Sequence, residues 1–126
     1  MSGRMNVLLG HDGSEESWKA FRQTIERAEA AGDDVSIAIY DDTAVEATPA
    51  EIEQRIRSEL EGHGVDTEIR HIDGHVAGTL VEIVDGEDFD RLVIAGGNRS
   101  TLGKIQLGSV AEFVVLNSET PVTLVR

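Results

Sequence analysis

The residues best suited to binding chemistry lie between Arg91 and Ser109, in the sequence RLVIAGGNRSTLGKIQLGS. The apolar run Leu92–Ala95 is typical of a buried strand, and the residues after it are mainly glycine, polar and basic. A helix is predicted to begin at Ser109, where Ser109 and Glu112 have the spacing of a capping box. A strand, a glycine-bearing loop and a helix N-terminus in this order present backbone N–H groups to an anion. This segment is therefore a candidate phosphate-binding loop.

Side chains of the same loop are suited to contact phosphate oxygens. Arg99, Ser100 and Lys104 are expected to supply donors alongside the backbone N–H groups of Ser109 and Val110. The alternative is that the loop binds nothing and that its basic residues only offset an acidic surface.

The sequence carries no signature of a Walker P-loop, a metal site or nucleophilic catalysis. Asn98 and Ile105 stand where a P-loop requires glycine and Ser or Thr, and no G-x-G-x-x-G is present. His63, His71 and His75 have no convincing ligand spacing and are expected to be exposed to solvent. No nucleophile has a base placed to activate it. We therefore expect a binding protein and not an enzyme, with slow hydrolysis of ATP left open.

A second candidate site follows the first apolar stretch, where Asp12 precedes two small residues, Gly13 and Ser14. A carboxylate at this position could accept hydrogen bonds from a ribose or from the edge of an adenine. Aspartate also commonly organises the turn in which it lies. The sequence gives this structural role at least equal weight.

Apolar and amphipathic patterns alternate along the chain and predict the elements that position both loops. Thr67–Ile72 is a comparatively polar strand, which indicates one wet face or a place at the edge of a sheet. The other predicted strands are Met5–Leu9, Val35–Tyr40, Leu92–Ala95 and Pro121–Val125, and the first and third of these are expected to be buried.

Cap signals and apolar stripes predict four helices between these strands. Ser14 is the expected N-cap of the first helix, which Gly32 ends. Thr48 and Glu51 form a capping box for the second, and the third covers about Val76–Asp85. The side chains expected to face the core from the fourth helix are Val110, Phe113, Val114 and Leu116.

Strands and helices that alternate in this way predict an α/β fold, with a doubly wound parallel sheet covered by helices on both faces. We expect residues 1–126 to form a single domain. Ligands of such sheets bind outside the carboxyl ends of the strands, where the direction of winding reverses. The loops Gly10–Ser14 and Gly96–Ser109 are expected to meet there.

The composition limits the compartment and the partners. The 126 residues include 24 acidic and 11 basic ones, for a formal net charge of −13, which disfavours nucleic acid and anionic membranes as partners. The chain has no cysteine, no apolar run of membrane-spanning length and no signal-peptide core, so we expect a cytoplasmic protein. An acidic, lysine-poor surface is typical of halophilic proteins, in which salt screens the self-repulsion.

Three stretches together resemble the universal stress protein family: DGSEESWKA, RLVIAGGNRSTLGKIQLGSVAEFVV and the ending TPVTLVR. The resemblance covers the whole chain. It implies a three-layer α/β/α sandwich, Rossmann-like, with a five-stranded sheet of order 3-2-1-4-5. It also implies a homodimer paired through the last strand, Pro121 to Arg126, and a stress-response role with bound ATP or AMP, with Mg²⁺ if ATP is bound.

The phosphate loop of nucleotide-binding members has the pattern G-x-x-G-x9-G-[ST]. The resemblance places the last glycine and the hydroxyl residue at Gly108 and Ser109, the second glycine at Asn98 and the first at Ala95. The binding residues that it implies are Asp12, Gly13 and Ser14 near the adenosine, Ile39 and Tyr40 along the base, and Ala95, Gly96, Asn98, Arg99, Ser100, Gly108, Ser109 and Val110 around the phosphates.

Two hypotheses follow from the residues that replace the loop glycines. Asn98 tolerates a positive φ better than most residues, whereas Ala95 adds a methyl group near the expected ligand. The first hypothesis is a dimeric adenine-nucleotide-binding protein. The second is a nucleotide-free dimeric interaction or regulatory protein on the same fold.

Overall fold

Five parallel strands form one sheet with the order β3-β2-β1-β4-β5, as predicted. The structure is a computed structural model that describes residues 4–96 and 107–126. The strands are β1 (Asn6–His11), β2 (Asp34–Ile39), β3 (Thr67–His71), β4 (Arg91–Ala95) and β5 (Val122–Val125). The comparatively polar β3 lies at one edge of the sheet, which confirms the position that its composition indicates.

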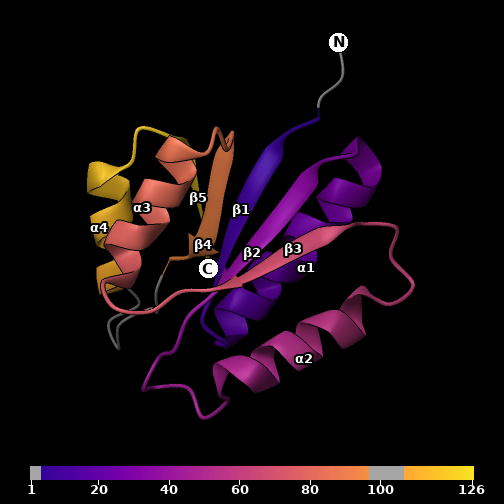
Figure 1. Cartoon of the computed structure of the whole chain (residues 1–126), viewed down its shortest axis with the longest axis horizontal. Helices are drawn as coiled ribbons and strands as arrows, with labels where there is room; N and C mark the ends of the chain where they lie inside the picture. Colours follow the sequence, from indigo (N-terminus) through magenta and orange to yellow (C-terminus); the bar gives the residue numbers. More distant parts are fainter. Residues whose placement is uncertain (1–3, 97–106) are drawn as a thin grey trace.

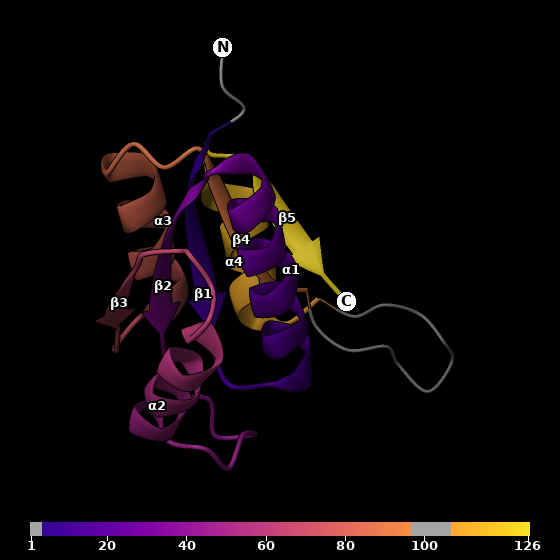
Figure 2. The same cartoon turned by 90° about the vertical axis from the view of Figure 1, so that its right-hand side faces the viewer.

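Four helices cover the two faces of the sheet (Figures 1 and 2). They are α1 (Glu15–Ala31), α2 (Pro49–Leu60), α3 (Val76–Gly86) and α4 (Ser109–Asn117). Helices α1 and α2 pack on one face, and α3 and α4 pack side by side on the other. The fold is therefore the three-layer α/β/α arrangement. None of the helices that the structure describes is both long and apolar enough to cross a membrane.

Side chains of the central strand β1 alternate between two hydrophobic clusters. Val7 and Leu9 enter the cluster under α1 and α2, whereas Leu8 enters the cluster under α3 and α4. This alternation points His11 toward α1 and α2, where its side chain is fully buried. The last residue of the central strand therefore lies in the core.

The predicted starts of α1 and α2 are confirmed by their caps. The Ser14 side chain accepts a hydrogen bond from the Ser17 N–H at 3.2 Å. At α2, the Thr48 hydroxyl accepts from the Glu51 N–H and the Glu51 carboxylate accepts from the Thr48 N–H, which completes a capping box. Gly32 ends α1 with a φ of 77°, a conformation that suits glycine.

Three local predictions are wrong. Ser109 is the first helical residue of α4 and not its N-cap, so no capping box with Glu112 forms; the N-cap is Gly108, which has no side chain. Leu116, expected in the core, is 75% exposed. Strand β1 continues to His11, two residues beyond its predicted end at Leu9, because its pairing with β2 extends to that residue.

The exposed positions expected for three histidines agree with the structure. His63 and His71 are exposed and pair with Glu29 and Glu53, respectively. His75 is also exposed and is the N-cap of α3, since its Nδ1 accepts the Gly78 N–H at 2.9 Å. In the described part of the chain, no cluster of three or more histidine, aspartate or glutamate residues is arranged to hold a metal ion.

Candidate functional site

A pocket of about 530 Å³ lies at the carboxyl ends of β1, β2 and β4, beside the N-terminus of α4. The end of β1 and the start of α1 contribute Asp12, Ser14 and Glu16, and residues 40–45 contribute the wall after β2. Strand β4 adds Ala95, and the rest of the described wall is Val76 and residues 108–111. The pocket thus forms where the winding of the sheet reverses, as the sequence predicts.

The structure brings many of the predicted site residues together around this pocket. Those that line it are Asp12, Ser14, Tyr40, Ala95, Gly108, Ser109 and Val110. Asn98, Arg99 and Ser100, as well as Lys104, lie outside the described residues.

Three predicted site residues are near the pocket but do not line it. Gly13 packs against α2, where a Cβ at this position would lie 2.7 Å from the Ile52 Cδ1 atom. Ile39 is completely buried in the cluster under α1 and α2. Gly96 donates its N–H to the Val125 carbonyl at 2.9 Å, so this residue continues the pairing of β4 with β5.

Several residues of the pocket were missed by the sequence interpretation. Glu16, Asp41 and Asp42 line it together with Thr43, Ala44, Val45 and Val76. The segment from Asp41 is polar and carries no motif in the sequence. Its place directly after β2, the neighbour of β1, is the signal that could have assigned it to the site.

The Asp12 carboxylate organises its own turn as well as facing the pocket. Its Oδ1 atom accepts the Ser14 N–H at 2.9 Å and the Ser17 hydroxyl at 2.7 Å. Burial by itself raises the pKa of Asp12, but the hydrogen bonds from Ser14 and Ser17 outweigh this effect and the pKa lies below its ordinary value. Asp12 is therefore a fixed negative charge in the wall of the pocket.

The wall after β2 makes the same end of the pocket more negative. Tyr40 is 6% exposed, and burial, followed by the charges of Asp12 and Asp42, raises the pKa of its phenol, which stays protonated. The Asp42 carboxylate accepts the Ala44 N–H at 2.9 Å. Among the described lining residues, Asp12, Glu16, Asp41 and Asp42 are acidic and none is basic.

Another part of the pocket wall is formed by the first turn of α4. Gly108 offers no side chain to cap the helix, and no side-chain hydrogen bond caps it among the described residues. The first intrahelical bond runs from the Glu112 N–H to the Gly108 carbonyl, so the N–H groups of Ser109 and Val110 precede it. Since Ser109 and Val110 line the pocket, this turn supplies donors and the positive end of a helix dipole.

Comparison with known proteins agrees with this architecture. A model of the universal stress protein family matches residues 3–126. A universal stress protein of Methanocaldococcus jannaschii is 28% identical over 137 aligned positions, which cover 95% of this chain and 81% of that protein.

Solved structures of universal stress proteins share the fold. One, in complex with cAMP, is 27% identical with a TM-score of 0.73, and the match covers 97% of this chain and 96% of that chain. Another, from Archaeoglobus fulgidus in complex with dAMP, is 20% identical with a TM-score of 0.63, and the match covers 97% of this chain and 98% of that chain. At 20% identity the second likeness concerns the fold alone.

Proposed function

The chain belongs to the universal stress protein family, and on this premise we propose that it binds an adenine nucleotide, AMP or ATP, in the pocket beside α4. The observation that carries the proposal is that acidic side chains and a helix N-terminus line the same pocket. The acidic lining residues include Asp12, and the N–H groups come from the start of α4.

A nucleotide matches both kinds of lining group at once. Ribose hydroxyls and the adenine amino group are donors and suit the carboxylates of Asp12 and Asp42. A phosphate group is an anion and suits the first turn of α4, where Ser109 and Val110 line the pocket. A ligand with donors at one end and a negative charge at the other is the class that this geometry favours.

A relative supports the same ligand class. The universal stress protein that is 27% identical was solved in complex with cAMP, which combines adenine, ribose and phosphate. Binding of ATP would bring more negative charge toward an acidic wall. We propose that Mg²⁺ accompanies ATP and offsets this charge, whereas AMP needs no such ion.

Nucleotide release and titration test the proposal directly. We expect the supernatant of the heat-denatured protein to contain an adenine nucleotide on ion-exchange chromatography. We also expect calorimetry in high salt to show binding of AMP or Mg-ATP. No released nucleotide together with no heat on titration would contradict the proposal.

A charged residue introduced at the start of α4 tests whether the nucleotide binds at this site and not elsewhere on the surface. Ser109→Glu puts a carboxylate where the phosphate is proposed to lie, and an acidic residue in the first turn is compatible with the helix dipole. We expect this variant to lose nucleotide binding without losing helicity. Leu116→Glu is the matched control, since it adds the same charge to the same helix at a position that is 75% exposed.

The nucleotide-free alternative is favoured by one observation. The Ala95 residue, at the first glycine position of the family pattern, lines the pocket and carries a methyl group that glycine lacks. If this group and the acidic wall exclude nucleotides, the chain is a dimeric interaction protein on the same fold. Ala95→Gly then restores binding that the wild-type protein lacks, as measured in the same titration.

We also propose that two copies of the chain form a dimer through Pro121 to Arg126. Strand β5 is the other edge of the sheet, so one row of its backbone groups has no strand partner among the described residues. Addition of the same strand from a second copy would pair this row. Sedimentation equilibrium is expected to give the mass of a dimer, and a monomer at all tested concentrations would exclude it.

A further inference from the structure

His11 is a fully buried histidine at the end of β1, between the sheet and the layer formed by α1 and α2. Its Nδ1 atom accepts the Gly13 N–H at 3.0 Å. Its ring meets that of Trp18 edge to face, with centroids 4.3 Å apart, and also approaches Phe21, with centroids 6.1 Å apart. The ring is therefore held on several sides.

The hydrogen bond from Gly13 determines the form of the His11 ring. Because Nδ1 accepts a hydrogen bond, the proton of the neutral ring lies on Nε2. Nε2 is buried and has no hydrogen-bond partner in the part of the chain that the structure describes. An unpartnered buried donor costs free energy, so an apolar side chain would fill this space at lower cost. The hydrogen bond that Nδ1 accepts from the Gly13 N–H offsets the cost of the unpartnered Nε2 donor.

The Nδ1 atom acts on the turn that carries a wall of the proposed nucleotide pocket. Gly13 lies between Asp12 and Ser14, and the Asp12 carboxylate binds both the Ser14 N–H and the Ser17 hydroxyl. Gly13 itself has a φ of 86°. His11 Nδ1 is thus the acceptor that fixes the central amide of this turn, and it acts from the core side.

We propose that His11 is a positioning residue for the nucleotide pocket, whose neutral Nδ1 atom fixes the Gly13 amide and so holds the Asp12 carboxylate toward the ligand. Protonation of Nδ1 replaces an acceptor by a donor, which breaks the bond to Gly13 and releases the turn. This inference rests on the proposed nucleotide binding.

The surroundings of His11 keep its ring neutral near neutral pH. Burial is the main cause and lowers the pKa of His11 to about 4. Asp12 in the turn raises this pKa, Arg55 and Glu59 on α2 lower and raise it, respectively, and Arg22 on α1 lowers it. The turn is therefore held at neutral pH and is released only in acid.

Two substitutions at His11 separate the effect of its hydrogen-bond acceptor from the effect of filling its buried space. His11→Asn keeps an oxygen acceptor near the position of Nδ1, whereas His11→Leu fills the space without an acceptor. In the nucleotide-free protein, we expect the Gly13 amide of His11→Leu to exchange its hydrogen about tenfold faster, and that of His11→Asn to stay protected. We expect AMP affinity at neutral pH to fall about tenfold in His11→Leu and to be largely restored in His11→Asn.

A pH titration of the Gly13 amide resonance gives a further readout. In the wild-type protein this resonance is expected to shift together with those of the His11 ring as the pH falls toward 4. In His11→Asn the shift is expected to disappear. If His11→Leu does not fold, this comparison of the wild-type protein with His11→Asn decides whether His11 holds the turn.

The outcomes separate this inference from the proposed function. If the wild-type protein binds no adenine nucleotide, the proposed function fails, while hydrogen exchange and the pH titration still report whether His11 holds the turn. If His11→Leu binds AMP as tightly as the wild-type protein, or if His11→Asn restores nothing, His11 does not position the pocket. A Gly13 amide that stays unaffected in His11→Leu overturns the inference as well.

Discussion

Asp12 combines two roles that the sequence presents as alternatives. Its carboxylate faces the pocket and also accepts two hydrogen bonds from its own turn, from the Ser14 N–H and the Ser17 hydroxyl. The residue type explains why both are possible, because one carboxylate has several lone pairs and Oδ1 alone accepts both local bonds. A turn-forming aspartate is therefore no argument against a binding aspartate at this position.

Two substitutions at Asp12 separate its structural role from its charge. Asp12→Ala removes both hydrogen bonds and is expected to lower the free energy of unfolding by about 1–3 kcal/mol. Asp12→Asn keeps an acceptor oxygen and is expected to cost less than half as much. Urea unfolding at neutral pH measures both effects, and equal midpoints for Asp12→Ala and the wild-type protein would contradict the role in the turn.

His11 gives the stability of the protein a specific dependence on pH. The pKa of the buried ring is lowered to about 4 from an unfolded value near 6.5, so the unfolded chain binds a proton more readily between these values. The free energy of unfolding is therefore unaffected by this group above about pH 6.5. It decreases as the pH falls from 6.5 toward 4, because the unfolded chain takes up the proton first. At about 1.36 kcal/mol per pKa unit, the loss amounts to about 3 kcal/mol.

The variant His11→Leu is the control for this dependence, because it fills the same buried space and cannot titrate. The carboxylates also change stability in acid, but they do so in both proteins. From pH 7 to pH 4, we expect the wild-type protein to lose about 3 kcal/mol more of its free energy of unfolding than His11→Leu, as measured by urea unfolding. Parallel pH profiles of the two proteins would show that His11 does not titrate as proposed.

At the scale of a single element, the start of a helix is predictable from the sequence where only one residue is a good N-cap. Thr48 and Glu51 have no competing neighbours and form the expected capping box, whereas Gly108 and Ser109 are both acceptable N-caps. The exposed Leu116 has a similar cause. Helix α4 is apolar around most of its circumference, so its sequence does not define which face is buried.

The pocket could be located from the sequence more easily than its wall could be named. Alternating strands and helices define the switch point and hence the loops after β1 and β4. The acidic residues after β2 belong to a connection without a regular pattern, and only the neighbouring positions of β1 and β2 place them there. His11 falls within the predicted loop Gly10–Ser14, and only the pairing of β1 with β2 places it in the strand.

The capping box of α2 makes a testable contribution to stability. Thr48→Ala removes the acceptor for the Glu51 N–H and is expected to lower the free energy of unfolding by about 1 kcal/mol. Thr43→Ala is the matched control, since Thr43 is exposed in the same connection and caps no helix in the described structure. Urea unfolding measures both, and equal losses would show that the cap contributes nothing specific.

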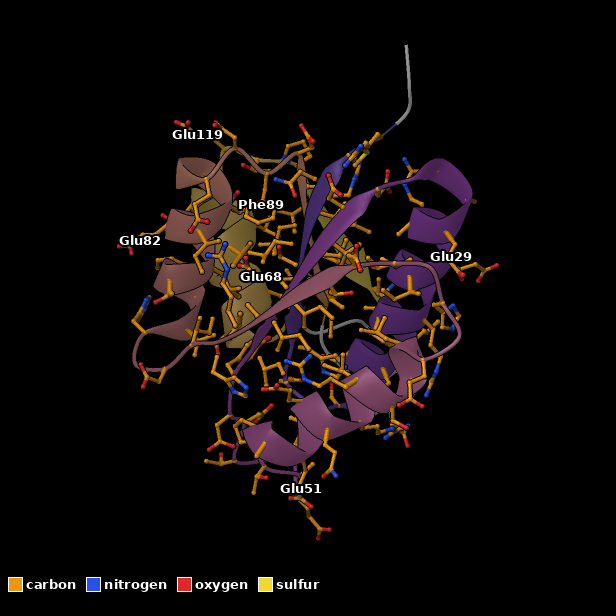
Figure 3. The ribbon with its side chains drawn as sticks, turned by 45° about the vertical axis from the view of Figure 1, so that its right-hand side comes forward. Glu29, Glu51, Glu68, Glu82, Phe89 and Glu119 are labelled. Atoms are coloured by element: carbon orange, nitrogen blue, oxygen red, sulfur yellow. The ribbon has the colours of Figure 1, made fainter. Side chains whose placement is uncertain are left out.

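Acidic side chains project from several elements of the described part of the chain. In Figure 3, the labelled Glu29, Glu51, Glu82 and Glu119 project outward from different parts of the fold, whereas Phe89 lies within it. The ion pairs within the described residues are mostly exposed, and such pairs contribute little each. With a formal net charge of −13, repulsion among carboxylates is the larger electrostatic effect on this fold.

Salt is therefore expected to stabilise the protein, because it screens repulsion that outweighs the attraction in surface ion pairs. From 0.1 to about 2 M KCl the Debye length falls from about 10 Å to below 3 Å. We expect a gain of about 1 kcal/mol or more, which corresponds to a rise in Tm of about 4 °C in circular dichroism melts.

A double variant, Glu82→Gln with Glu119→Gln, removes two exposed charges that form no ion pair among the described residues, and is expected to gain less from the same salt. An unchanged Tm across this range, or an equal gain in the double variant, would contradict repulsion as the cause.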